Sequence, residues 1–303
     1  MESRNFTLRR SGNSPANAIL TISCLSPEDL QTGRTRLQGL HDLLLELDAG
    51  RFEYNRNFAH LFEAESSGAL SATFQEIYEV CDIGIDPILF IDGHGDELKG
   101  MRMPNGEWVS WKSLLEHFQP MIDRTRGQLT VIIAACHSMA AIKHVDSNRK
   151  LPFSFYYGYP SEISAGVVQD ETEKIYRSLL LDHGKILVDE HRLRIECFSE
   201  YDHLTPALAP ALLLSKSPTL SAQTQPELSR NEINKYISVE MARAGRPVKG
   251  TRHRINEILG SGALAVQIAR NLMHDTERLE RVIEDIYAFM KGGALPPLPN
   301  DSD

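Results

Sequence analysis

The sequence predicts an α/β protein with a mostly parallel β-sheet, helices on both faces of that sheet and a helical C-terminal extension. Two observations support this fold class. Short apolar runs rich in β-branched residues, at 87–91 and 129–135, are typical of strands that are buried on both faces, as in parallel sheets. Stretches of ten or more residues with helical periodicity alternate with such runs, which is typical of strand–helix–strand units.

Composition and charge narrow the class of protein. The net charge of −9 on 303 residues argues against a general nucleic-acid binder. We expect no membrane span, because no run of about 18 apolar residues occurs. The first residues are polar and lack the apolar region of a signal peptide, so we expect a cytoplasmic protein. The four cysteines are widely separated and show no C-x-x-C spacing, which argues against zinc sites and a disulfide framework.

The first half of the chain begins with an expected strand at 16–25. Ser26, Pro27 and Asp29 then give the signals of a helix start, namely a cap, a proline in the first turn and an acid near the positive helix end. That helix runs to about 47, and the segment that follows it, 52–62, is either a second strand or an irregular loop. The next expected elements are a helix at 66–80, a strand ending near 92, a hairpin at 98–111 and a helix at 110–126.

The second half continues the alternation and then becomes helical. After the second apolar run we expect a short helix at 139–145, an aromatic strand at 152–159, a helix at 170–181, a strand or hairpin at 185–198, and helices at 231–244 and 254–290. Gly260 and Gly262 interrupt the last helix near its start. The expected organisation is a flexible N-terminus at 1–14, an α/β domain at 15–214, a linker or exposed loop at 215–230, a helical region at 231–290 and a flexible tail at 291–303.

Each of the two apolar runs ends at a reactive side chain. His94 follows the first run, between Gly93 and Gly95, and Cys136 follows the second. The carboxyl ends of parallel strands meet at one edge of a sheet, so we expect the imidazole and the thiol to meet there. A cysteine attacks as its thiolate, and a histidine can take the thiol proton and later protonate a leaving amine. Backbone N–H groups near Gly95 and Cys136 could hold a developing oxyanion.

The first apolar run ends in His94-Gly95 and the second in Ala135-Cys136, and the histidine precedes the cysteine by 136 − 94 = 42 residues. This pattern resembles that of the caspase-like cysteine peptidases, the superfamily of caspases, metacaspases, gingipains and separase. The resemblance covers roughly residues 15–200. It implies a caspase-like fold and a cofactor-free endopeptidase in which His94 and Cys136 form a catalytic dyad. Stand-alone bacterial relatives act in signalling, cell death and defence, so it also implies a regulated protein or peptide substrate. The C-terminal helices are a candidate site for a regulatory protein partner.

The same resemblance suggests where the substrate pocket lies. In this family the strand after the cysteine helps to wall the pocket, which makes Tyr157, Tyr159 and Ser161 candidates; the tyrosines are equally readable as core aromatics. Metacaspases carry an acid two residues before the cysteine, which favours cleavage after Arg or Lys. That position is Ala134 in this chain. Selection for a basic residue is therefore doubtful, and a small or apolar residue before the cut is an open option.

Further charged residues leave alternatives open. Asp92 and Asp96 flank His94 and either orient its imidazole or are solvated loop acids, and Asp92 is also a pocket candidate. Arg102 and Arg124 are conceivable sources of the arginine that selection for Asp would need. Two other classes of function remain as alternatives: a non-catalytic binding or scaffold module with the same fold, and a metal-dependent hydrolase built on the acids around His94.

Overall fold

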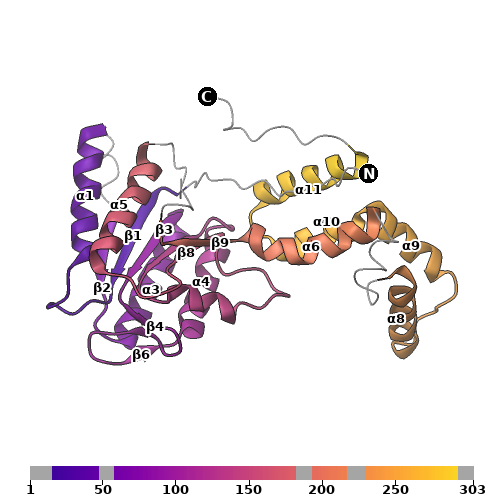
Figure 1. The fold of residues 1–303 in the computed structure, drawn as a ribbon, viewed down its shortest axis with the longest axis horizontal. Helices are drawn as coiled ribbons and strands as arrows, with labels where there is room; N and C mark the ends of the chain where they lie inside the picture. The colour runs from indigo at the N-terminus through magenta and orange to yellow at the C-terminus, as the bar shows by residue number, and fades with distance from the viewer. Residues whose placement is uncertain (1–15, 48–57, 182–192, 217–228, 293–303) are drawn as a thin grey trace. The chain divides into compact units, whose positions relative to one another are not determined.

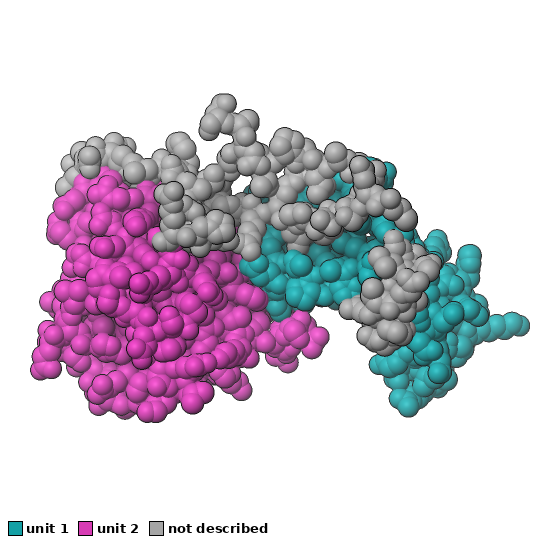
Figure 2. All heavy atoms as spheres, viewed as in Figure 1, with its two compact units in different colours: residues 1–10, 201–303 teal, residues 11–200 magenta. Residues whose placement is uncertain are grey.

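The computed structural model describes residues 16–47, 58–181, 193–216 and 229–292. The chain forms two compact units, one of residues 11–200 and one of residues 201–303 with 1–10 (Figure 2). The domain boundary expected after residue 214 falls inside helix α6 (Glu200–Lys216). The expected N-terminal segment 1–14, most of the expected linker and tail, and the first part, 185–192, of the expected strand or hairpin at 185–198 lie outside the described residues.

A six-stranded sheet forms the centre of the first unit, with strand order β2-β1-β3-β7-β8-β9 (Figure 1). Neighbouring strands are parallel from β2 to β8, and β9 pairs antiparallel with β8. This confirms the predicted α/β class and mostly parallel sheet. The strands are β1 (Ala18–Ser23), β2 (Ala59–Glu63), β3 (Pro87–Asp92), β7 (Thr130–Ala134), β8 (Phe155–Gly158) and β9 (Glu196–Ser199).

Helices cover both faces of this sheet. Helices α3 (Ser67–Asp82) and α4 (Trp111–Arg124) pack against each other, and their buried side chains form one core with alternate residues of β1, β3 and β7. Helices α1 (Thr32–Leu47) and α5 (Ala165–Leu181) lie side by side (Figure 1). Because successive strand residues point to opposite faces, the intervening residues of the strands meet this second pair of helices.

A small antiparallel sheet follows the central strand β3. Its strands are β4 (His94–Asp96), β5 (Gly100–Arg102) and β6 (Trp108–Val109), in that order. The turn between β5 and β6 contains Gly106, whose N–H bonds the Met103 carbonyl, so the predicted hairpin is confirmed. Strand β4 begins one residue after Gly93, so the chain changes sheets immediately before His94.

The start of α1 differs from the prediction. The cap signals at Ser26 mark a turn, and the helix begins six residues later at Thr32. The Ser26 N–H donates to the Asp29 Oδ2 at 2.8 Å, and the Ser26 carbonyl accepts the N–H of Asp29 and the side chain of Gln31. These side-chain bonds satisfy the backbone in a compact turn, so the first helical hydrogen bonds are not needed there.

The second unit is helical in its described residues. The predicted helix at 231–244 is α8 (Arg230–Arg243), and the predicted long helix from 254 is three helices, α9 (Thr251–Ser261), α10 (Ala263–Leu272) and α11 (Thr276–Lys291). Gly262 separates the first two with φ of 77°, and Asp275 caps the third. A small apolar cluster joins Leu214, Ile255 and Leu259. In the described part of the chain, no helix is both long and apolar enough to cross a membrane.

A buried ion pair connects α1 to the end of β3. Arg36 donates from both terminal nitrogens to the two oxygens of Asp92, at 2.7 and 2.8 Å, and both side chains are at most 1% exposed. The guanidinium also lies 4.3 Å from the centroid of the Phe90 ring. Gly33 allows this close packing, because a Cβ there would lie 2.8 Å from the Asp92 Oδ2. The pair therefore fixes the first turns of α1 against the carboxyl end of β3.

Removing one member of this pair is expected to destabilise the first unit strongly. Asp92→Asn leaves the buried Arg36 without its counter-charge, and we expect a loss of about 3–5 kcal/mol in the free energy of unfolding. The double variant with Arg36→Met should recover most of that loss. Urea unfolding measures both.

The control is the exposed ion pair between Arg34 of the same helix and Glu63 at the end of β2, with side chains 63% and 55% exposed. Glu63→Gln should cost at most about 1 kcal/mol. A similar small cost for Asp92→Asn would contradict the structural role assigned to the buried pair.

Candidate active site

Strands β3 and β7 bring His94 and Cys136 to the same edge of the sheet. The two strands are parallel neighbours, and Asp92 pairs with Ala134 in their register. His94 and Cys136 each lie two residues beyond this last pair. The Gly93 N–H also donates to the Ala134 carbonyl at 3.4 Å, so the two chains continue side by side past the strand ends.

Gly95 then passes directly against the backbone of Cys136. A Cβ built on Gly95 would lie 1.9 Å from the Cys136 carbonyl oxygen, a distance that no real side chain could occupy. Glycine is therefore required at this position by the close approach of two backbones. The contact places the residues that carry the imidazole and the thiol next to each other, although they are 42 positions apart in the sequence.

Cys136 lies at a sharp turn between β7 and the 3₁₀ helix η1 (Ser138–His144). The next residue, His137, has φ of 55°, an unusual left-handed conformation for a side chain that is not glycine. The Cys136 side chain is half-buried. Its Sγ accepts the Ile163 N–H at 3.4 Å and donates to the Ile163 carbonyl at 3.5 Å. Among the described residues the Cys136 N–H has no acceptor, which leaves it free to bind an oxyanion.

His94 has a carboxylate partner that the sequence analysis missed. The Asp29 Oδ1 lies 3.0 Å from the His94 Nε2, and the second Asp29 oxygen accepts the Ser26 N–H. A carboxylate only accepts hydrogen bonds, so in the neutral imidazole the proton is on Nε2 and Nδ1 is left as the basic atom. Burial alone would raise the pKa of Asp29, but the hydrogen bonds from His94 and Ser26 outweigh it, and the pKa lies below its usual value.

His94 and Cys136 line one cavity of about 170 Å³. The wall is completed by the segment before α1, by the end of β7 and by the start of α5. The lining residues are Leu25, Asp29, Leu30, Thr32, Gly93, His94, Ala134, Ala135, Cys136, Ile163, Ala165 and Val168. The cavity therefore combines a thiol, an imidazole and a carboxylate with a mainly apolar wall.

Most of the predicted pocket residues lie elsewhere, and Ala134 alone among them lines the cavity. Asp92 is neither a solvated acid nor a pocket residue, because it is fully buried against Arg36. Tyr157 in the inner strand β8 and Tyr159, one residue beyond its end, are core aromatics, 4% and 1% exposed. Ser161 is exposed and accepts the His137 N–H through its carbonyl.

The other predicted charged residues also stay outside this cavity. Arg124 forms an ion pair with Asp82 at 2.9 Å. Arg102 in β5 is the backbone register partner of His94 in β4, and it does not line the cavity. Asp96 accepts the N–H groups of Leu98 and Lys99, and this lowers the pKa of its carboxyl. It caps the turn after β4 and does not orient the imidazole.

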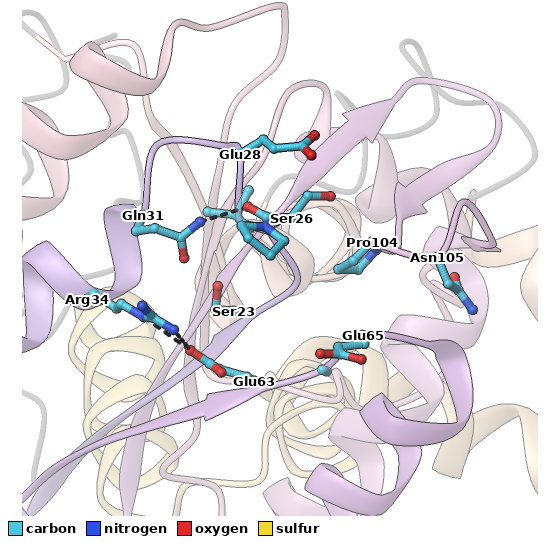
Figure 3. Close-up of a pocket in the computed structure, with 12 residues that line it drawn as sticks. Ser23, Ser26, Glu28, Gln31, Arg34, Glu63, Glu65, Pro104 and Asn105 are labelled. Carbon is cyan, nitrogen blue, oxygen red and sulfur yellow. Dashed lines mark hydrogen bonds and ion pairs between the residues drawn. The ribbon is translucent and has the colours of Figure 1, made fainter.

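A larger cavity of about 500 Å³ lies beyond the 25–31 segment, over the carboxyl ends of β1 and β2 (Figure 3). Its wall carries the carboxylates of Glu28, Glu63 and Glu65 and the guanidinium of Arg34, which bonds Glu63. Neither His94 nor Cys136 lines it. The smaller cavity is therefore the one that contains the reactive groups.

No protein-family model matches the chain, and no curated protein matches its sequence. Within the described residues, no group of three or more His, Cys, Asp or Glu side chains is placed to hold a metal ion.

The lowered pKa of Asp29 gives a pH-dependent contribution to stability. A carboxyl with a lowered folded-state pKa stabilises the fold above its unfolded pKa of about 3.9, and this contribution is lost as the pH falls through the folded-state value. Asp29→Asn should therefore reduce the free energy of unfolding at pH 6, and its difference from the wild type should shrink below about pH 4. Denaturant unfolding from pH 2 to 6 measures this difference. Glu28→Gln, which changes an exposed neighbour, should show no such trend; a difference for Asp29→Asn that is constant over this range would refute the assignment.

Proposed function

We propose that this protein is a caspase-like cysteine endopeptidase that cleaves a protein substrate through Cys136 and His94. The observation that carries the proposal is the shared cavity, in which both side chains lie on adjacent backbone segments held together by the Gly95 contact. The parallel sheet and the hairpin after His94 support the resemblance to this family.

The proposed reaction begins with proton transfer from the Cys136 thiol to the free Nδ1 of His94. The sulfur attacks the peptide carbonyl carbon, and the Cys136 N–H stabilises the oxyanion that forms. When the tetrahedral intermediate collapses, the C–N bond breaks and the leaving amine takes the proton from His94. Water then attacks the acyl-enzyme with His94 as the base, which releases a carboxylate product and restores the thiol.

Asp29 has a positioning role in this scheme. Its carboxylate holds the Nε2 proton and so keeps Nδ1 basic, and it stabilises the imidazolium that forms during attack. Because Asp29 is itself held by the Ser26 N–H, the imidazole is attached to the turn before α1.

The first prediction from this proposal concerns the nucleophile. A peptide probe with a cysteine-reactive group should label the wild type and fail to label Cys136→Ala, and peptide turnover should fall by about a thousandfold or more in Cys136→Ala and His94→Ala. Cys197→Ala is the matched control, since Cys197 is also half-buried and should leave labelling unchanged. Equal labelling of the wild type and Cys136→Ala would refute the proposal, and stable capture of a partner without any turnover would favour a binding module.

The second prediction concerns Asp29. Asp29→Asn can present its amide N–H₂ to Nε2, which would move the imidazole proton to Nδ1 and block the base. We expect kcat to fall by about a hundredfold, the lower end of what general acid–base catalysis contributes, with KM nearly unchanged. Steady-state kinetics measures both parameters. A folded Asp29→Asn variant with wild-type kcat would exclude the positioning role.

A further inference from the structure

The wall of the Cys136 cavity is almost free of charge. Eight of its twelve lining residues are apolar, and they come from the 25–30 segment, from 93 and the end of β7, and from 163–168. These residues are Leu25, Leu30, Gly93, Ala134, Ala135, Ile163, Ala165 and Val168. The other four are His94 and Cys136, which react in the proposed function, and Asp29 and Thr32.

The single carboxylate in the wall already accepts two hydrogen bonds. One Asp29 oxygen accepts from the His94 Nε2 and the other from the Ser26 N–H, so a substrate cation there would compete with the bond that orients the imidazole. No Lys or Arg from the described residues lines the cavity, and the guanidinium of Arg36 is buried against Asp92. The charge of Arg102 acts on Asp29 and helps to lower the pKa of that carboxyl, so it is already opposed by an acid. A charged substrate side chain would therefore give up part of its water to a mainly apolar wall without a counter-charge of its own, which is unfavourable.

Thr32 supplies the one uncommitted polar group of the wall among the described residues. It is 5% exposed, and its backbone N–H bonds the Leu30 carbonyl, but its hydroxyl has no partner in the part of the chain that the structure describes. This hydroxyl is not among the fully buried polar atoms that lack a partner, so solvent reaches it in the cavity. A hydroxyl on a bound ligand would replace that solvent.

The size of the cavity limits the ligand further. A cavity of about 150 Å³ holds one benzene molecule, and this one has about 170 Å³, part of which must be taken by the carbonyl that Cys136 attacks. His94 and Leu30 in its wall are both about half exposed, so the cavity opens to solvent on their side, and its volume against the apolar wall favours a small side chain.

We propose that this cavity is the specificity pocket for the residue before the cut bond, and that it selects a small uncharged side chain: Ala, Ser, Thr or Val. Thr32 bonds the hydroxyl of Ser or Thr. This inference rests on the proposed peptidase function and adds to it the class of substrate. The selecting residues come from the 25–32 and 163–168 segments, and Tyr157 and Tyr159 take no part.

The test is cleavage of matched fluorogenic peptides by the full chain, in which only the residue before the cut varies. We expect kcat/KM for Thr, Ser, Val and Ala to exceed that for Arg, Lys, Asp and Glu by about a hundredfold or more. Thr32→Val should reduce the ratio of kcat/KM for Thr to that for Val by about three- to tenfold, the value of one hydrogen bond.

A designed change of charge gives an independent test. Ala165 lines the cavity, is exposed and begins α5, so Ala165→Asp places a carboxylate at the cavity where the helix N-terminus favours it. We expect this variant to raise kcat/KM for Arg and Lys by about tenfold. Gly166→Asp is the matched control, because it adds the same charge at an exposed neighbour that does not line the cavity.

The outcomes separate this inference from the proposed function. Cleavage that depends on Cys136 but prefers Arg, Lys, Asp or a large side chain would overturn the inference and leave the peptidase proposal standing. Equal effects of Ala165→Asp and Gly166→Asp would also overturn it. Absence of both cleavage and Cys136 labelling would overturn the proposed function, and this inference with it.

Discussion

The candidate site depends on the register between β3 and β7. Asp92 pairs with Ala134, an offset of 134 − 92 = 42 residues, and His94 and Cys136 are separated by the same 42. The imidazole and the thiol therefore leave the sheet from equivalent positions on neighbouring parallel strands. A slip of one residue would turn one of these side chains toward the opposite face. The Gly95 contact with Cys136 keeps this alignment beyond the last strand hydrogen bonds.

The buried pair of Arg36 and Asp92 extends this alignment to the helical layer. Asp92 ends β3 two residues before His94, and Arg36 lies in the first turns of α1, so the ion pair holds the start of the helix at the reactive edge. The turn that carries Asp29 directly precedes this helix. The position of Asp29 against the His94 ring is therefore set by the ion pair between Arg36 and Asp92, neither of which lines the cavity. A structural interaction in the core thus determines the geometry of a surface group.

The sequence predicted the parts of this site that follow from local patterns. Buried strands, their alternation with helices and the two residues at the strand ends were all readable from periodicity. The partner of His94 was not, because Asp29 is 65 residues away and its turn carries the usual signals of a helix start. Tyr157 and Tyr159 were equally ambiguous, since an aromatic strand reads the same whether it walls a pocket or fills a core. Only the pairing of β8 with both β7 and β9 decides that it is an inner strand.

The two reactive groups are held by different partners, and this bears on how a substrate would enter. His94 is bound to the Asp29 carboxylate through Nε2, a charge-assisted bond at 3.0 Å, whereas the thiol makes two long contacts with the backbone of Ile163. Sulfur is a weak donor and a weak acceptor, so these contacts hold Cys136 far less firmly than Asp29 holds the imidazole. A bound peptide needs to displace only the weaker pair. The rigid element of the site is then the proton acceptor, and the movable one is the sulfur that must approach the carbonyl carbon.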